Sequence, residues 1–283
     1  MISSDRIFIW KAFREWKSVL GDMYRDILTP ELEAKVRQSA TDIKYGDDTE
    51  TFEKLSGHSI DSMITKEKID EFRQRYSHIR AYHACRTSDV QSYYEKGILP
   101  SIALKDVQLA RFREIFLNGD FPELTEEMLQ QSIEKVGPKD EDLCLVIDDR
   151  FIIEYCGHYL IYGGEYMGNL VSQLPIENIE PYRSVLMKIG KPTFIKINLP
   201  NINKYASNGN IWELNSEILT EWLYNIANSR MESRFLDFTF KINEALSPKH
   251  IYTHYHPIKI VDPLMGYKTY NAEMGEYEDS EIK

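Results

Sequence analysis

The spacing of apolar residues changes near residue 79, and this change limits the folds open to the chain more than any other pattern in it. From Ile7 onward, apolar residues such as Trp10 and Phe13 recur at intervals of three and four, which predicts a helix with one buried face. Beyond residue 79, short β-prone segments alternate unevenly with helical ones. The sequence therefore predicts a helical region over residues 1–78 and an α+β domain over residues 79–283.

Two further helices of the first region begin at recognisable capping residues. Thr29 precedes Pro30, and a proline is favoured at the first position of a helix. Thr65 precedes a segment whose Ile69 and Phe72 lie at helical spacing, so it is expected to cap a third helix. These helices are expected either to pack on the second domain or to regulate it.

In the second domain, the pattern predicts short strands and helices in mixed order. The expected strands are 79–85, 143–147, 151–155, 158–162, 193–199, 235–242 and 251–260. The expected helices are a short one ending at Gly97 and the segments 104–117, 125–136, 165–174, 181–189 and 218–227. An acidic tail follows.

The composition argues against several classes of protein. The 34 basic and 45 acidic residues give a net charge of −11, which disfavours a protein that mainly grips the nucleic-acid backbone. No run approaches the roughly 18 apolar residues that cross a bilayer, and the first residues lack the order of a signal peptide. We therefore expect a cytoplasmic protein without a membrane partner. Three scattered cysteines do not suit a disulfide framework or a paired-cysteine zinc site.

The segment from Tyr82 to Pro100, YHACRTSDVQSYYEKGILP, carries the first candidate site. A histidine stands late on a strand, a small residue and an arginine follow, and a helix ends in Gly-Ile. This pattern resembles the opening motif of the ADP-ribosyltransferase superfamily, and the order of elements resembles that family over residues 79–262. The resemblance implies that His83 bonds the ribose of the nicotinamide half of NAD. Cys85 would lie beside the dinucleotide, and Arg86 would hold its pyrophosphate.

The segment GHYLIYGGEYMGNL, residues 157–170, resembles the family's second motif, in which tyrosines sandwich the nicotinamide ring. Tyr159 and Tyr162 are three residues apart, so on the expected strand they would point to opposite faces. We therefore expect Tyr162 and Tyr166 to provide the two rings, with Tyr159 as a further contact. The alternative is that these tyrosines are half-buried core residues.

The family's third motif is a glutamate on a late strand. Cleavage between nicotinamide and ribose builds positive charge on the sugar, which a nearby carboxylate stabilises. Glu244 follows the strand expected at 235–242, and Glu165 is the alternative. Ile242 stands where the arginine-modifying branch has an acid or amide, and no Ser-Thr-Ser strand is present, so arginine on a protein is disfavoured as the acceptor.

The resemblance implies an NAD-dependent transferase in which NAD is a substrate. The acceptor would be a macromolecule or a nucleotide, in the manner of bacterial toxins or anti-phage effectors that a regulatory or antitoxin protein can silence. Two alternatives stay open: an NAD-dependent RNA 2′-phosphotransferase, and a non-catalytic interaction module on the same fold. No metal is expected, because His254 and His256 with His158 give only a weak zinc pattern.

Overall fold

The computed structural model describes residues 6–39, 48–119, 121–137, 142–229 and 232–278. The fold is α+β, as expected. The chain divides into two compact units, of which unit 1 comprises residues 1–80 and 198–240, and unit 2 comprises residues 81–197 and 241–283. The predicted boundary at residue 78 therefore misses one segment, because residues 198–240 return to the N-terminal helices.

Unit 1 is mainly helical. Its elements are β1 (Ile7–Phe8), α1 (Phe13–Met23), α2 (Pro30–Gln38), α3 (Asp48–Ser56), α4 (Ile60–Met63), α5 (Lys66–Arg75) and α13 (Asn208–Asn228). Thr29 and Thr65 cap their helices as predicted, since each side chain accepts a backbone N–H. Residues 7 and 8 form a strand rather than the start of a helix, because they pair in parallel with His78 and Ile79.

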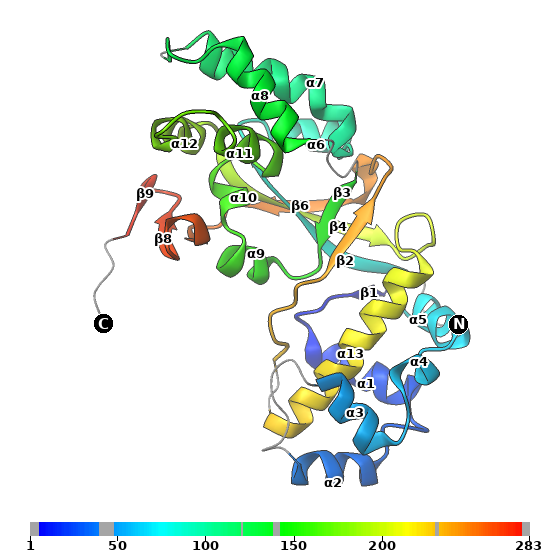
Figure 1. Ribbon diagram of the computed structural model, residues 1–283. Coiled ribbons are helices and arrows are strands. Elements are labelled where there is room, and N and C mark those ends of the chain that lie inside the picture. Colours follow the sequence, from blue (N-terminus) through cyan, green and yellow to red (C-terminus); the bar gives the residue numbers. More distant parts are fainter. Residues whose placement is uncertain (1–5, 40–47, 120, 138–141, 230–231, 279–283) are drawn as a thin grey trace. The chain divides into compact units, whose positions relative to one another are not determined.

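Helix α13 is the central element of unit 1 and packs against α2, α3 and α5 (Figure 1). It begins ten residues earlier than the predicted segment 218–227, because Ser207 and Asn210 form a reciprocal cap at its first turn. Its apolar side chains meet those of the N-terminal helices, for example where Trp222 lies 6.3 Å from Phe52 between ring centroids.

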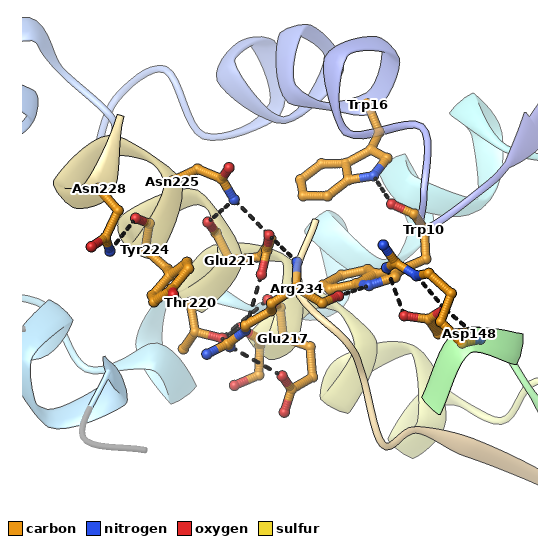
Figure 2. A network of polar contacts seen from close by, with 12 residues as sticks. Trp10, Trp16, Asp148, Glu217, Thr220, Glu221, Tyr224, Asn225, Asn228 and Arg234 are labelled. Carbon is orange, nitrogen blue, oxygen red and sulfur yellow. Dashed lines mark hydrogen bonds and ion pairs between the residues drawn. The ribbon is translucent and has the colours of Figure 1, made fainter. Parts of the chain in front are cut away.

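A buried ion pair fastens the segment after α13 to this helix (Figure 2). The Glu221 side chain is fully buried, and its Oε2 lies 2.9 Å from Nε of Arg234. Glu221 Oε1 accepts hydrogen bonds from the backbone N–H of Arg234 at 3.0 Å and from Nδ2 of Asn225 at 2.5 Å. Removing one partner of such a pair leaves a buried charge unpaired, so it lowers the free energy of unfolding by about 3–5 kcal/mol. Residues 232–238, which form neither helix nor strand, are held in this way.

Three strands run from one unit into the other along the chain: β2 (His78–Thr87), β4 (Lys191–Pro200) and β5 (Thr239–Ile242). The larger sheet has the strand order β5-β3-β2-β4-β6, with β1 beside β2. Strands β3 (Leu143–Val146) and β6 (Ile251–Tyr255) belong to unit 2. The expected strand 251–260 is two strands in different sheets, because the chain leaves β6 before Pro257 and resumes as β7 (Lys259–Asp262).

The helices of unit 2 follow the predicted positions with two exceptions. They are α6 (Gln91–Lys96), α7 (Ser101–Phe112) with the π-helical turn η1 (Arg113–Leu117), α8 (Glu126–Val136), α9 (Asp149–Tyr155), α10 (His158–Ile161), α11 (Glu165–Ser172) and α12 (Glu180–Lys188). Helices α7, α8 and α12 all contact α11 (Figure 1). Their apolar side chains form one core with residues of β2 and β4, including Tyr82 and Phe194.

The exceptions are α9 and α10, which were predicted as strands at 151–155 and 158–162. Asp148 caps α9, since its Oδ1 accepts the backbone N–H of Arg150 at 3.1 Å, so the chain after β3 begins a helix instead of a second strand. Both helices pack against β7. Short apolar runs fit either a buried strand or a buried helix, and here the cap and the packing decide.

The second sheet of unit 2 has the order β7-β8-β9, with β8 (Lys268–Asn271) and β9 (Glu276–Tyr277). The turn η3 (Pro263–Met265) joins β7 to β8, and η2 (Pro248–His250) precedes β6. Residues 268–277 were expected to precede or begin an acidic tail, yet they form a hairpin. Of the acidic residues in that tail, Asp279 and Glu281 lie outside the described residues.

Candidate functional site

A cavity of about 120 Å³ opens in unit 2 between α10, α11, α12 and η3. We call it the tyrosine pocket. Its lining residues are His158, Tyr159, Tyr162, Gly164, Glu165, Gly168, Asn169, Ser172, Arg183, Leu186 and Leu264. Three of the predicted site residues, Tyr159, Tyr162 and Glu165, are therefore brought together here.

Tyr159 of α10 and Tyr162, the C-cap that follows it, both line the cavity because this segment is helical. Residues three apart lie on the same face of a helix, whereas the predicted strand would have turned Tyr159 and Tyr162 to opposite faces. Gly157 lets the helix approach β7 closely, since a Cβ there would lie 2.1 Å from the Val261 backbone oxygen. The expectation that only one of these two rings lines the cleft from its own element was wrong.

Two glycines make the turn from α10 into α11. Gly163 and Gly164 have φ values of 90° and 95°, a region that residues with a side chain rarely adopt. The turn places Glu165 at the first position of α11, where its side chain is exposed and its Oε1 accepts a hydrogen bond from Asn169 at 3.4 Å. The carboxylate therefore stands at the rim of the cavity.

A fully buried carboxylate supports Tyr162 from behind. Asp262 Oδ2 lies 2.6 Å from the hydroxyl oxygens of Tyr162 and Tyr277, and these two oxygens are 2.8 Å apart. Asp262 Oδ1 accepts the backbone N–H of Leu264 at 2.9 Å. Burial, and then the bond to Asp262, raises the pKa of the Tyr162 phenol well above its ordinary value. Tyr162 is thus a neutral donor whose position is fixed.

His158 contributes a neutral imidazole. Burial lowers its pKa below the ordinary value, against the opposing charges of Asp262 and Glu165. Its Nδ1 is buried and has no hydrogen-bond partner among the residues that the structure describes. The ring lies 4.1 Å from that of Tyr159 between centroids. This nitrogen is therefore unpaired among the described residues, and the ring that carries it lines the cavity.

Arg183 supplies a cation to the same lining. Its Nη1 donates to Oε1 of Glu180 at 2.8 Å, and its Cζ lies 5.7 Å from the ring centroid of Tyr162. The pocket therefore combines aromatic walls with one guanidinium and one carboxylate.

The first motif lies elsewhere in unit 2. Tyr82 belongs to the same apolar core as Tyr162, and successive residues of a strand alternate in direction, so His83 leaves β2 on the opposite face. There its Nδ1 is 3.5 Å from the Cys144 carbonyl oxygen and its ring 6.3 Å from that of Tyr93. Burial lowers the pKa of His83. The structure does not bring His83 to the tyrosine pocket.

Cys85 and Arg86 are engaged in the fold rather than facing the pocket. The Cys85 thiol is buried, donates to the Thr193 carbonyl at 3.6 Å, and has a pKa raised by burial to about 11. Arg86 donates to the backbone carbonyls of Leu160, Met187 and Ile189. Its guanidinium thus connects β2 to α10 and to the end of α12. These donors bind backbone carbonyls, whereas a contact with pyrophosphate was expected.

Glu244 and Tyr166 also lie outside the pocket lining. Glu244 is exposed and follows β5, two residues before Leu246, which pairs with Ile98 in an isolated bridge. Tyr166 is on α11, packs against the apolar core, and has a buried hydroxyl without a partner among the described residues. Burial raises the pKa of Tyr166.

Sequence reasoning missed four residues of this site: His158 as a pocket residue, Arg183, Asp262 and Tyr277. His158 precedes the tyrosines of the second motif directly, so the motif itself held that signal, although it was weighed only as a zinc ligand. Arg183 and the Asp262–Tyr277 pair carry no local signal, because only the packing of α12 and β9 brings them to α10.

Of the three histidines in the weak zinc pattern, His254 and His256 stay close, with ring centroids 5.5 Å apart, but His158 lies elsewhere. His254 accepts or donates a hydrogen bond with the Tyr94 hydroxyl at 2.8 Å, and His256 lies 3.1 Å from the Thr193 hydroxyl, while His158 is in the tyrosine pocket. Within the described ranges, no group of three or more His, Cys, Asp or Glu side chains is arranged to hold a metal ion. In the same ranges, no helix combines the length and the apolar character needed to cross a membrane.

Comparison with models of protein families, with curated proteins and with solved structures found no match for this chain.

Proposed function

We propose that unit 2 cleaves NAD and transfers its ADP-ribose to an acceptor, with the nicotinamide end bound in the tyrosine pocket. One observation carries the proposal: Tyr159, Tyr162 and Glu165, taken from the segment that resembles the family's second motif, line a single cavity with the neutral His158. Aromatic walls with a few polar groups are typical of a site for a planar ligand.

The size of the cavity limits what enters it. Pockets that enclose a drug-sized ligand measure roughly 300–1,000 Å³. The tyrosine pocket, at about 120 Å³, suits one ring and the atoms next to it. The rest of the dinucleotide would lie outside, across the exposed side chains at the rim.

The chemistry assigns a role to each lining group. When the bond between the nicotinamide nitrogen and ribose C1 breaks, its electron pair leaves with the ring, and positive charge develops on the sugar. The Glu165 carboxylate stabilises that charge. The acceptor then attacks C1 and loses its proton to solvent or to a base. His158 bonds a ribose hydroxyl without adding a charge that would oppose the cationic ring.

This assignment changes two expectations. The imidazole that contacts the ribose is His158 rather than His83, because His158 is in the cavity lining. The carboxylate is Glu165 rather than Glu244, because Glu165 stands beside the two tyrosines. Both changes follow from residues that share one cavity.

Release of nicotinamide from NAD by the full chain tests the proposal. Glu165→Gln keeps the shape and removes the charge, so we expect a loss of rate of about a hundredfold. Glu177→Gln is the matched control, since Glu177 is also an exposed glutamate of unit 2 but lies outside the pocket lining. Glu244→Gln separates the two carboxylates.

A large loss in Glu244→Gln with little change in Glu165→Gln would move the site away from this pocket. If the protein neither releases nicotinamide nor binds NAD at millimolar concentration, the result favours a non-catalytic interaction module. If release is seen, transfer of labelled ADP-ribose in a bacterial lysate identifies the acceptor, and growth of bacteria that express the protein, with and without phage, tests a role as a toxin or an anti-phage effector.

The proposal gives unit 1 the role of contacting the target or a regulatory or antitoxin protein. Deleting residues 1–78 is a poor test of that role, because α13 would lose the helices on which its apolar face packs. Substitution of exposed residues on α2, followed by measurement of target choice, leaves the core intact.

A further inference from the structure

We infer that Arg183 binds a phosphate group of the ligand that occupies the tyrosine pocket. The inference rests on the proposed function only in using the same cavity, since binding can occur without cleavage. The ligand is then a phosphate ester of a ribose that carries a cationic heterocycle.

The donors of Arg183 are only partly used by the protein. Nη1 is bonded to Oε1 of Glu180, whereas Nε and Nη2 have no hydrogen-bond partner among the residues that the structure describes. The Arg183 side chain is 16% exposed and that of Glu180 is 52% exposed, so the cation is the more enclosed member of the pair. A guanidinium with two unpaired nitrogens can bind a phosphate through N–H groups of both.

The guanidinium is also held in place. Its Cζ lies over the ring of Tyr162 at 5.7 Å, and the Tyr162 hydroxyl is fixed by its short bond to the buried Asp262. A group that is already positioned loses less freedom when it binds a ligand. Arg183 is therefore a prepared contact rather than a mobile surface cation.

The charges around Arg183 decide which anion suits it. The carboxylates of Glu165, Glu180 and Asp262 lie near the same cavity, and His158 is neutral because burial lowers its pKa. A bare anion is opposed by these carboxylates. A ligand that carries a cation and an anion meets Glu165 with the first and Arg183 with the second.

Arg86 and Arg183 differ in how many of their guanidinium nitrogens bind the protein. Arg86 was expected to hold a phosphate, but its donors go to three backbone carbonyls. All three guanidinium nitrogens of Arg86 donate to the protein, whereas only Nη1 of Arg183 does so among the described residues.

Two probes that differ by one phosphate test the inference: nicotinamide mononucleotide and nicotinamide riboside, titrated into the full chain by calorimetry. We expect the mononucleotide to bind about tenfold more tightly, and Arg183→Gln to remove that difference while the riboside affinity stays the same. Arg183→Lys should keep part of the difference. Arg113→Gln, which removes an exposed cation outside the pocket, should leave it unchanged.

Glu180→Gln sharpens the test, because it removes the charge that competes for Nη1. We expect this variant to bind the mononucleotide more tightly than the parent protein. Equal affinities for the two probes in the parent, failure of both to bind, or a preference that survives in Arg183→Gln would overturn the inference. Phosphate-dependent binding without release of nicotinamide from NAD would uphold it while refuting the transferase proposal.

Discussion

Two histidines of unit 2 have pKa values lowered by burial, yet they differ in what they can do. The imidazole of His83 lies against the Cys144 carbonyl, on the face of β2 away from the tyrosine pocket. The imidazole of His158 lines the pocket and has a buried nitrogen without a partner among the described residues. A histidine that fits a sequence motif is therefore not always the one that lies at a cavity, because the fold decides what stands next to the ring.

The arginines of the two regions differ in the same way. Arg86, in the first motif, donates to backbone carbonyls of α10 and of the end of α12, so it connects two helices that line the pocket. Arg183 lines the pocket and keeps donors available. We therefore interpret the first motif as structural and the tyrosine pocket as the place where a ligand binds.

The largest expected effect concerns Arg86. Arg86→Ala leaves three partly buried carbonyls without their donor, so the free energy of unfolding should fall by about 2–4 kcal/mol. Urea denaturation of the variant beside Arg183→Ala measures this difference, and Arg183→Ala should cost about 1 kcal/mol or less. Equal losses in the two variants would remove the contrast between the two regions.

The next effect separates the two histidines by activity. His158→Ala removes the imidazole from the pocket, and we expect nicotinamide release from NAD to slow by about tenfold to thirtyfold. His83→Ala should change the rate by less than about threefold, since its ring faces away from the pocket. Steady-state assays of both variants check this, with thermal unfolding as the control for folding. The reverse order of effects would restore His83 to the site.

The smallest effect is on the pH dependence of stability. Both imidazoles have folded-state pKa values below the ordinary 6.5 or so, so the unfolded chain takes up their protons first as pH falls. Their contribution to stability is present above that pH and is lost as pH falls below it. Urea denaturation at pH 5, 6 and 7 should show a shallower rise with pH in His83→Gln and in His158→Gln than in the parent. A slope that neither substitution alters would show that these rings titrate normally.

Local signals in the sequence predicted much of the secondary structure. Thr29 and Thr65 cap their helices and Gly97 follows the last residue of its helix with positive φ, as predicted; in the structure Thr125 and Gly137 do the same at the two ends of α8. These signals involve atoms within a few residues of one another, so no distant part of the chain can override them easily.

The candidate site was predicted in part. The segment 157–170 contains seven of the eleven residues that line the pocket. The pattern nevertheless gave the wrong element, because Ile152, Leu160 and Ile161 are buried in a helix as readily as in a strand. The error reversed the expected faces of Tyr159 and Tyr162. Likewise, no local pattern in residues 198–240 shows that this segment packs with the N-terminal helices.

By itself the sequence determined the α+β class, the helix starts that capping residues mark, and the stretch of chain that supplies most of the pocket lining, since these depend on neighbouring residues. Only the tertiary structure decided that Arg86 donates to backbone carbonyls, that His83 faces away from Tyr162, and that Arg183 lines the pocket. It also decided that Asp262 fixes Tyr162 from behind the lining. The physical reason is that the partner and the face of a polar side chain depend on residues that can lie more than a hundred positions away, as Tyr277 does from Tyr162, which local spacing does not record.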